Sequence, residues 1–212
     1  MSRLPAEWEP QSGVQLTWPH CDTEWYELEK VLECYVDIAS NILKYEPLMI
    51  VTRDMDECKA DIARITARKG IALDVESIRF YESPLNDTWA RDHGGISVFG
   101  DGGQKYLYDF VFNGWGLKFA SDLDNQLTKN IFSQGAFEDD VMGVDMRPYV
   151  LEGGSIDSDG CGTMLTTTEC LCSLNRNEYL SQEEIEEELC GAFGLQRILW
   201  LDHGTIIGDD TD

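Results

Sequence analysis

Short apolar runs alternate with stretches in which apolar residues recur every three or four positions. The runs predict β-strands and the stretches predict amphipathic helices. The expected strands are 13–18, 48–52, 76–82, 144–152 and 196–201. The expected helices are 24–44, 55–69, 121–134 and 182–192. Because strands and helices alternate along the chain, the pattern predicts an α/β fold.

Several polar and glycine residues mark where these helices should begin and end. Asp22 or Thr23 can cap the helix 24–44, since short polar side chains accept hydrogen bonds from the first free N–H groups. Gly70 is placed to end the helix 55–69 in a left-handed turn. Ser181 and Glu184 have the spacing of a capping box for the helix 182–192.

Two glycine-rich segments share one plan and predict β-hairpins. RDHGGISVFGDGG leads into a hairpin over 94–112, and LEGGSIDSDGCG into one over 153–172, turning at Asp159 and Gly160. Each begins with an acid at a strand end, and Asp92 and Glu152 are 60 positions apart. Asp210 lies 58 positions beyond Glu152. Successive units of about 60 residues would then each deliver an acid at one structural level. Coincidence in a Gly- and Asp-rich chain is the alternative.

The composition narrows the classes of function. The 212 residues include 40 acidic and 16 basic side chains, a net charge of −24, which disfavours nucleic acid as a partner and attracts cations. No run approaches the roughly 20 apolar residues of a membrane span, and the N-terminus lacks the apolar segment of a secretory signal. A cytoplasmic protein without a membrane partner is the expectation.

The cysteines and two acidic segments are the candidate metal ligands of the chain. The seven cysteines are irregularly spaced and form no CxxC pair, so they are expected to be reduced structural thiols. Cys170 and Cys172 should face the same way on a strand. DSDGCG (157–162) lacks the acids of a calcium loop and predicts a hairpin turn. DDTD (209–212) could hold a divalent cation, but the expectation is that no metal is bound.

Two acids stand out as candidates for binding a planar cation. Trp89 and Asp92 are three residues apart, and an aromatic face beside a carboxylate suits a guanidinium. In the alternative interpretation Trp89 is a core residue and Asp92 pairs with Arg91 or caps a turn. Glu152 follows an apolar run, so its carboxylate needs a partner or a raised pKa. It could instead accept hydrogen bonds from backbone N–H groups.

Seven motifs occur together that resemble those of the agmatine deiminase family, also called the porphyromonas-type peptidylarginine deiminases. They are PAEWEP (5–10), TWPH (17–20), NDTWARDHG (86–94), FNGWG (112–116), LEGGSI (151–156), NRN (175–177) and GDDTD (208–212). The resemblance implies a five-bladed α/β propeller, the pentein fold, of which this chain would supply about three to three and a half blades. It also implies hydrolysis of agmatine to N-carbamoylputrescine and ammonia through a covalent amidino-cysteine intermediate, in putrescine biosynthesis, with no metal or organic cofactor.

The resemblance also implies roles for particular residues. Asp92 would bind the guanidinium, and Glu152 would be the second acid, binding the guanidinium and steadying a histidine. Trp89 would line the substrate slot, and Asp210 would approach the distal amine of agmatine. In the motif FNGWG, Asn113 and Trp115 would be weaker pocket candidates.

The chain departs from the family pattern after Asp212. The family's catalytic histidine and nucleophilic cysteine are expected beyond that residue, so residues 1–212 are expected to be the N-terminal part of one catalytic domain and inactive alone. Peptidylarginine is the alternative substrate. A non-catalytic pentein-like binding module and a metal-dependent hydrolase using DDTD are alternatives of other classes. The sequence leaves a homo-oligomer open.

Overall fold

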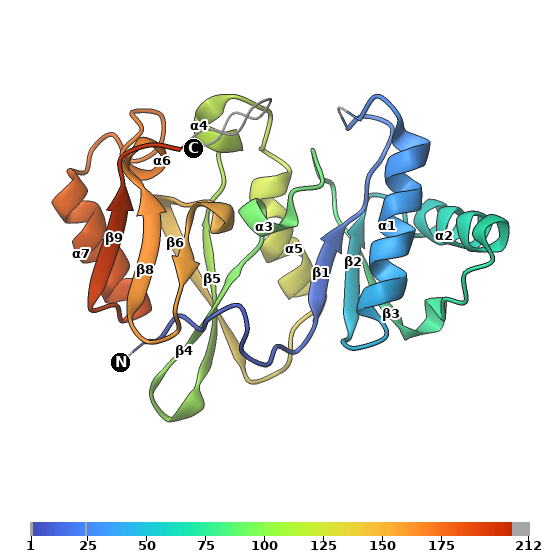
Figure 1. The fold of residues 1–212 in the computed structure, drawn as a ribbon, viewed down its shortest axis with the longest axis horizontal. Helices are drawn as coiled ribbons and strands as arrows, with labels where there is room; N and C mark the ends of the chain where they lie inside the picture. The colour runs from blue at the N-terminus through green and yellow to red at the C-terminus, as the bar shows by residue number, and fades with distance from the viewer. Residues whose placement is uncertain (1, 24, 205–212) are drawn as a thin grey trace. The chain divides into compact units, whose positions relative to one another are not determined.

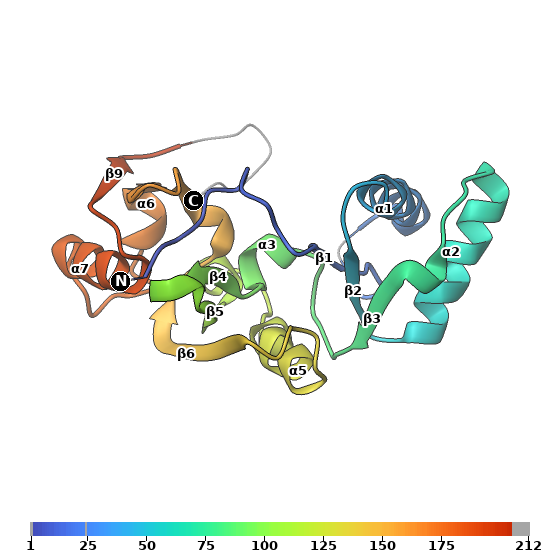
Figure 2. The same cartoon turned by 90° about the horizontal axis from the view of Figure 1, so that it is seen from below.

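The structure of the chain is a computed structural model that describes residues 2–23 and 25–204 (Figures 1 and 2). The described residues divide into two compact units. We call residues 10–90 and 129–136 the all-parallel unit, and residues 2–9, 91–128 and 137–204 the hairpin unit.

The all-parallel unit is a three-stranded sheet with the order β1-β2-β3, in which each strand runs parallel to its neighbour. Parallel neighbours require crossover connections, and the two crossovers here are helices. Figure 2 shows both helices on one face of the sheet. The elements are β1 (Val14–Thr17), α1 (Leu28–Ile42), β2 (Leu48–Thr52), α2 (Met55–Lys69), the 3₁₀ turn η1 (Val75–Ser77) and β3 (Ile78–Glu82).

The core of this unit forms where the helices cover the central strand. Ile50 on β2, Val36 on α1 and Ile62 on α2 are fully buried in one apolar cluster. Gly70 ends α2 in the left-handed conformation with φ of 66°, as expected from the sequence. The expected start of the first helix was wrong: α1 begins at Leu28, four residues later than expected, and its N-cap residue Glu27 makes no side-chain capping hydrogen bond.

The hairpin unit contains two three-stranded sheets with the orders β4-β5-β6 and β7-β8-β9. In each sheet the first two strands form an antiparallel hairpin and the third runs parallel to the second. The strands are β4 (Ile96–Phe99), β5 (Lys105–Val111), β6 (Val141–Val150), β7 (Asp157–Ser158), β8 (Thr163–Thr167) and β9 (Arg197–Leu201). The helices are α3 (Ala90–His93), α4 (Gly114–Leu117), α6 (Thr168–Leu171) and α7 (Gln182–Phe193), with 3₁₀ turns η2 (Asp101–Gly103), η3 (Asp124–Gln126) and η4 (Gly153–Ser155). Helix α5 (Leu127–Ser133) begins in this unit, and its residues from 129 onward belong to the all-parallel unit.

The repeat expected from the two glycine-rich segments is present in this unit. Asp92 lies on α3 just before the hairpin β4-β5, and Glu152 lies just before η4 and the hairpin β7-β8. Both acids therefore stand before the same hairpin-plus-parallel-strand module. The all-parallel unit is built differently, because its sheet contains no antiparallel pair. The number of propeller blades stays a prediction.

Two local expectations for the second hairpin were wrong. Strand β8 ends at Thr167, and residues 168–171 form the short helix α6, because the Thr167 hydroxyl accepts a hydrogen bond from Cys170 N at 3.2 Å and caps it. Cys170 is therefore buried on a helix and does not share a strand face with Cys172. All seven cysteines are free thiols. The expected turn at Asp159 is present, since its carboxylate accepts hydrogen bonds from Cys161 N and Thr163 N.

Helix α7 closes the core of the hairpin unit beside β8 and β9 (Figure 1). Its first turn holds the expected capping box between Ser181 and Glu184. The buried side chains of Ile185, Leu189 and Phe193 on α7 join an apolar cluster that includes residues of β5, β8 and β9. Among the described residues, no helix combines the length and apolar character needed to cross a membrane.

Candidate active site

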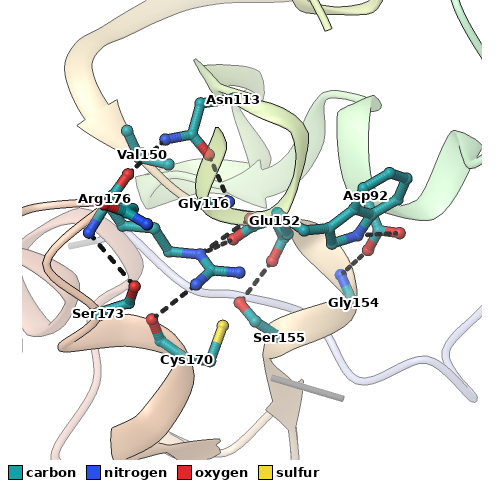
Figure 3. A network of polar contacts seen from close by, with 12 residues as sticks. Asp92, Asn113, Gly116, Val150, Glu152, Gly154, Ser155, Cys170, Ser173 and Arg176 are labelled. Atoms are coloured by element: carbon teal, nitrogen blue, oxygen red, sulfur yellow. Dashed lines mark hydrogen bonds and ion pairs between the residues drawn. The ribbon is translucent and has the colours of Figure 1, made fainter. Parts of the chain in front are cut away.

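Asp92 is the partly buried acid at the start of the first hairpin module, and both of its carboxylate oxygens accept hydrogen bonds (Figure 3). Gly154 N donates to Oδ1 at 3.1 Å, and the indole Nε1 of Trp115 donates to Oδ2 at 3.3 Å. Both donors are neutral. They fix the orientation of the carboxylate and leave its negative charge uncompensated by them, which is the arrangement that a cation-binding acid requires.

The two glycines after Glu152 permit this contact. A Cβ atom on Gly154 would lie 2.2 Å from Asp92 Oδ1, and one on Gly153 would lie 2.2 Å from the carbonyl oxygen of Arg91. Both distances are far inside van der Waals contact, so a side chain at either position would push the α3 turn away. The Gly-Gly pair of the second module therefore holds the acid of the first.

Trp115 is held in a strained loop. Its backbone is left-handed, with φ of 56°, a conformation that costs a non-glycine residue roughly 1–2 kcal/mol. The loop is stabilised by Asn113, whose Oδ1 accepts from Gly116 N at 2.9 Å and whose Nδ2 donates to the carbonyl of Asn175 at 2.7 Å. Phe112 and Phe119 pack edge-on against the indole ring, with centroids 5.0 and 5.6 Å away. The sequence marks Asn113 and Trp115 as weaker pocket candidates. In the structure Trp115 donates to Asp92 and Asn113 stabilises the loop, and their contact with a substrate stays a prediction.

Glu152 follows β6 and is 2% exposed. Arg176 Nε donates to both of its carboxylate oxygens, at 2.9 and 3.0 Å, and the Arg176 side chain is itself 2% exposed. The sequence predicts that the Glu152 carboxylate needs a partner or a raised pKa, and this ion pair supplies a charged partner inside the protein. Direct contact between Glu152 and a substrate stays a prediction.

Arg176 is the functional candidate that sequence reasoning missed. The family resemblance gives no role to the arginine of the motif NRN (175–177). Each of its three residues makes a different contact. The Asn175 carbonyl accepts a hydrogen bond from Asn113, and Arg176 binds Glu152. Asn177 forms two hydrogen bonds of 2.9 Å with the backbone of Val150. A single arginine between two asparagines, in a chain that buries an acid at 152, was the signal that could have found it.

Trp89 belongs to the all-parallel unit and is 44% exposed. Its indole Nε1 donates to Asp87 Oδ2 at 3.2 Å, and its ring lies against Trp25, with the centroids 5.7 Å apart and the planes tilted by 36°. One face of Trp89 is therefore supported within its own unit. The interpretation of Trp89 as a core residue was wrong, since nearly half of the side chain is accessible. Its contact with a substrate stays a prediction.

The described histidines serve packing and local hydrogen bonds. Burial lowers the pKa of His93 to about 4, so the ring is neutral at physiological pH, and it packs edge-on against Phe112. Burial and the charge of Arg53 lower the pKa of His20, whose Nδ1 lies 2.8 Å from Arg53 Nη1. This agrees with the expectation that His20 packs or forms hydrogen bonds. Cys58 is buried and Cys172 and Cys190 are partly buried, and these three thiols are poor nucleophiles because burial raises the pKa of each.

Two candidates raised by the sequence fall outside the described part of the chain. Asp210 and the DDTD cluster (209–212) lie beyond residue 204. Within residues 2–23 and 25–204, no group of three or more His, Cys, Asp or Glu side chains is arranged to hold a metal ion. The described site therefore consists of two acids from equivalent modules, each fixed by a different kind of donor. That this pair binds and orients a cation stays a prediction.

Comparison with known proteins identifies what the chain is similar to. Residues 3–212 match the family profile described as Porphyromonas-type peptidyl-arginine deiminase. An agmatine deiminase of Pseudomonas syringae pv. tomato is 36% identical over 221 aligned residues, which cover 99% of this chain and 55% of that protein.

Two solved structures are also similar. A substrate-bound agmatine deiminase of C. jejuni is 34% identical with a TM-score of 0.86, and the match covers 100% of this chain and 59% of that one. An agmatine deiminase of Enterococcus faecalis is 34% identical with a TM-score of 0.82, and the match covers 96% and 53%. The chain thus spans little more than half the length of the curated relatives that it matches.

Proposed function

Because the chain belongs to the Porphyromonas-type peptidyl-arginine deiminase family, we propose that it forms the N-terminal part of an agmatine deiminase. This enzyme would hydrolyse agmatine to N-carbamoylputrescine and ammonia. Residues 1–212 would then be part of a single catalytic domain with the pentein fold, as in the solved structures of agmatine deiminases that it resembles. The observation that carries the proposal is the shared polar network of Asp92 and Glu152 (Figure 3).

In this proposal Asp92 binds the substrate guanidinium. Its two oxygens are oriented by Trp115 Nε1 and Gly154 N, and an ionised carboxylate can accept a bidentate pair of hydrogen bonds from a planar cation. Fixing the guanidinium plane presents its central carbon to a nucleophile in one orientation. Holding the reacting groups in place in this manner lowers the barrier without any chemistry by the acid itself.

The remaining chemistry belongs to groups that the family places elsewhere. A cysteine thiolate would attack the guanidinium carbon, ammonia would leave, and water would release the ureido product from the thioether intermediate. A histidine would move the protons. Asp210 would meet the distal amine, and Trp89 would line the slot. We expect these groups to act with Asp92 and Glu152 in the complete gene product.

The proposal is tested by ammonia release from agmatine, with the ureido product identified by mass spectrometry. The complete gene product should turn over agmatine without added metal, and Asp92→Asn should lower kcat/KM by about 100-fold or more, since a fixed electrostatic contact to the reacting group is lost. Asp139→Asn is the matched control, because Asp139 is exposed and undergoes the same change of charge. Absence of turnover by the wild type would refute the function, and full activity of Asp92→Asn would refute the role of that acid.

Peptidylarginine is the second candidate substrate, because the family description names it. The two substrates differ at the far end of the side chain: agmatine carries a second cation there, and peptidylarginine carries neutral backbone. Wild-type kcat/KM for agmatine should exceed that for an acetylated arginine amide. The reverse preference would assign the chain to the peptidylarginine deiminases of the family.

A further inference from the structure

The Arg176 side chain is 2% exposed, and its contacts join it to Glu152 and to neighbouring segments (Figure 3). Nε donates to both oxygens of Glu152, and Nη1 donates to the carbonyl of Cys170 at 3.2 Å. A Cβ atom on Gly116 would lie 3.3 Å from Nη1, so the backbone of the loop that carries Trp115 packs directly on the guanidinium. The side chain therefore has one orientation, and it holds Glu152 in one as well.

The charges explain why such an enclosed arginine is needed. An acid as buried as Glu152 gives up its proton only if an opposite charge compensates for the loss of water. Gly154, two residues after Glu152, binds Asp92, which brings a second negative charge to the same network. Asp92 and Glu152 contribute two negative charges and Arg176 one positive charge, so the network has a net charge of −1. One guanidinium cation would neutralise it.

We propose that Arg176 is a positioning residue that keeps Glu152 ionised and oriented toward the substrate guanidinium. The inference rests on the proposed function. In this scheme Arg176 acts through Glu152: its Nε donates to the carboxylate, and its Nη1 donates to the carbonyl of Cys170. The side chain acts by setting the charge and the direction of the second acid.

The described polar network that includes Glu152 draws on three other segments, and two of its partner groups, Arg176 and Asp92, are titratable. Arg176 lies in the segment between α6 and α7, Asp92 lies on α3, and Cys170 on α6 contributes its carbonyl oxygen. Arg176 is the only cation among these three groups of the described network. Its removal would leave the buried Glu152 without its cation, so Glu152 would bind a proton at a higher pH than in the wild type.

The test is the pH dependence of agmatine turnover by Arg176→Gln in the complete gene product. At neutral pH, kcat/KM should fall by about 10- to 100-fold, the usual effect of removing the partner that orients an active-site ligand. The acid limb of the kcat/KM profile should move up by about one pH unit or more, so that the deficit shrinks as the pH rises. A purely structural role would lower activity by the same factor at every pH, and that result would overturn the proposal.

Arg176→Lys separates charge from orientation. Lysine keeps a positive charge but is a single point donor without the planar fork of arginine. We expect the wild-type acid limb together with a kcat/KM reduced by several-fold. An acid limb shifted as in Arg176→Gln, or wild-type kcat/KM at every pH, would contradict the assignment. Arg197→Gln is the matched control: Arg197 lies exposed on β9, and this variant should keep both the rate and the profile.

A readout without activity keeps this inference distinct from the proposed function. Carbon-13 NMR of protein labelled at the glutamate carboxyl carbons reports the ionisation of Glu152, with Glu152→Gln identifying the resonance. Glu152 should stay ionised in the wild type and in Arg176→Lys at pH 6, and it should be protonated in Arg176→Gln. If the wild type fails to deiminate agmatine, the proposed function falls while this titration still decides what Arg176 does to Glu152. An ionised Glu152 in Arg176→Gln would overturn the inference.

Discussion

Asp92 and Glu152 occupy equivalent places in two successive modules of the hairpin unit, and the protein holds them by different means. Asp92 is partly exposed and accepts hydrogen bonds from two neutral donors, Trp115 Nε1 and Gly154 N. Glu152 is 2% exposed and is bound by the guanidinium of Arg176. The backbone repeat therefore sets where each acid stands, whereas its surroundings set its charge balance. The partly exposed acid can rely on water to stabilise its charge, and the buried one requires an internal cation.

Neutralising each acid in turn is expected to reveal the largest difference between them. Glu152→Gln leaves the Arg176 charge buried without a counter-ion, and we expect it to lower the free energy of unfolding by about 3–5 kcal/mol. Asp92→Asn removes a charge held by neutral donors, one of which its amide oxygen can still satisfy, so the loss should be about 1 kcal/mol.

Chemical denaturation of the complete gene product measures both values. The two variants are matched in chemistry, because each replaces a carboxylate by the amide of the same length. Equal destabilisation by the two changes would show that the acids are anchored alike, contrary to the geometry. A smaller loss in Glu152→Gln than in Asp92→Asn would reverse the comparison.

A second prediction concerns the glycine that joins the two modules. Gly154→Ala places a Cβ atom 2.2 Å from Asp92 Oδ1 and should force the acid out of position. We expect a loss of about 1–3 kcal/mol in stability and a fall in kcat/KM of about 100-fold, since small misplacements at an active site have effects of that order. Activity toward agmatine and denaturation curves measure the two effects.

Gly191→Ala is the matched control for this substitution. Gly191 lies inside α7, and a Cβ atom there meets nothing within 4 Å. Alanine should therefore stabilise the helix by about 0.5–1 kcal/mol and leave activity unchanged. If Gly154→Ala is as harmless as Gly191→Ala, the contact between the modules has no role in holding Asp92.

The contrast between the two acids also explains which features could be predicted from the sequence. Asp92 and Glu152 were visible because each sits beside a strand end and a Gly-Gly pair, which are local patterns. The strands, the hairpin turns and the cap at Ser181 follow from the same kind of local signal. Even so, Thr167 acted as a helix cap where alternation predicted continued strand, because a threonine suits both positions.

The partner that holds each acid was not visible in the sequence. Arg176 is 24 residues from Glu152, and Trp115 is 23 residues from Asp92. Such partners are set by the packing of separate elements, and no periodicity connects them. The need to compensate a buried charge could have narrowed the search for the partner of Glu152. An acid predicted to be buried implies a nearby cation, and this chain has only 16 basic residues from which to choose.

The smallest effect is expected from the neutral donor at Asp92. Trp115→Phe removes the indole N–H that donates to Asp92 Oδ2 at 3.3 Å and keeps an aromatic ring between Phe112 and Phe119. A hydrogen bond of this kind contributes about 1 kcal/mol, so kcat/KM for agmatine should fall about 3- to 10-fold. The pH profile should stay in place, in contrast to Arg176→Gln, because no charge is removed from the network.

Trp200→Phe provides a control with the same chemistry away from the site. Trp200 Nε1 donates to Glu186 Oε2 at 3.0 Å, which is also an indole-to-carboxylate hydrogen bond, between β9 and α7. Its loss should affect stability by a similar amount and leave kcat/KM unchanged. A fall in kcat/KM confined to Trp115→Phe, with an unshifted acid limb, would separate orientation of Asp92 by a neutral donor from control of Glu152 by a charge. An acid limb that shifts in Trp115→Phe as it does in Arg176→Gln would mean that the two acids titrate as one unit, and the distinction between their anchors would then have no functional consequence.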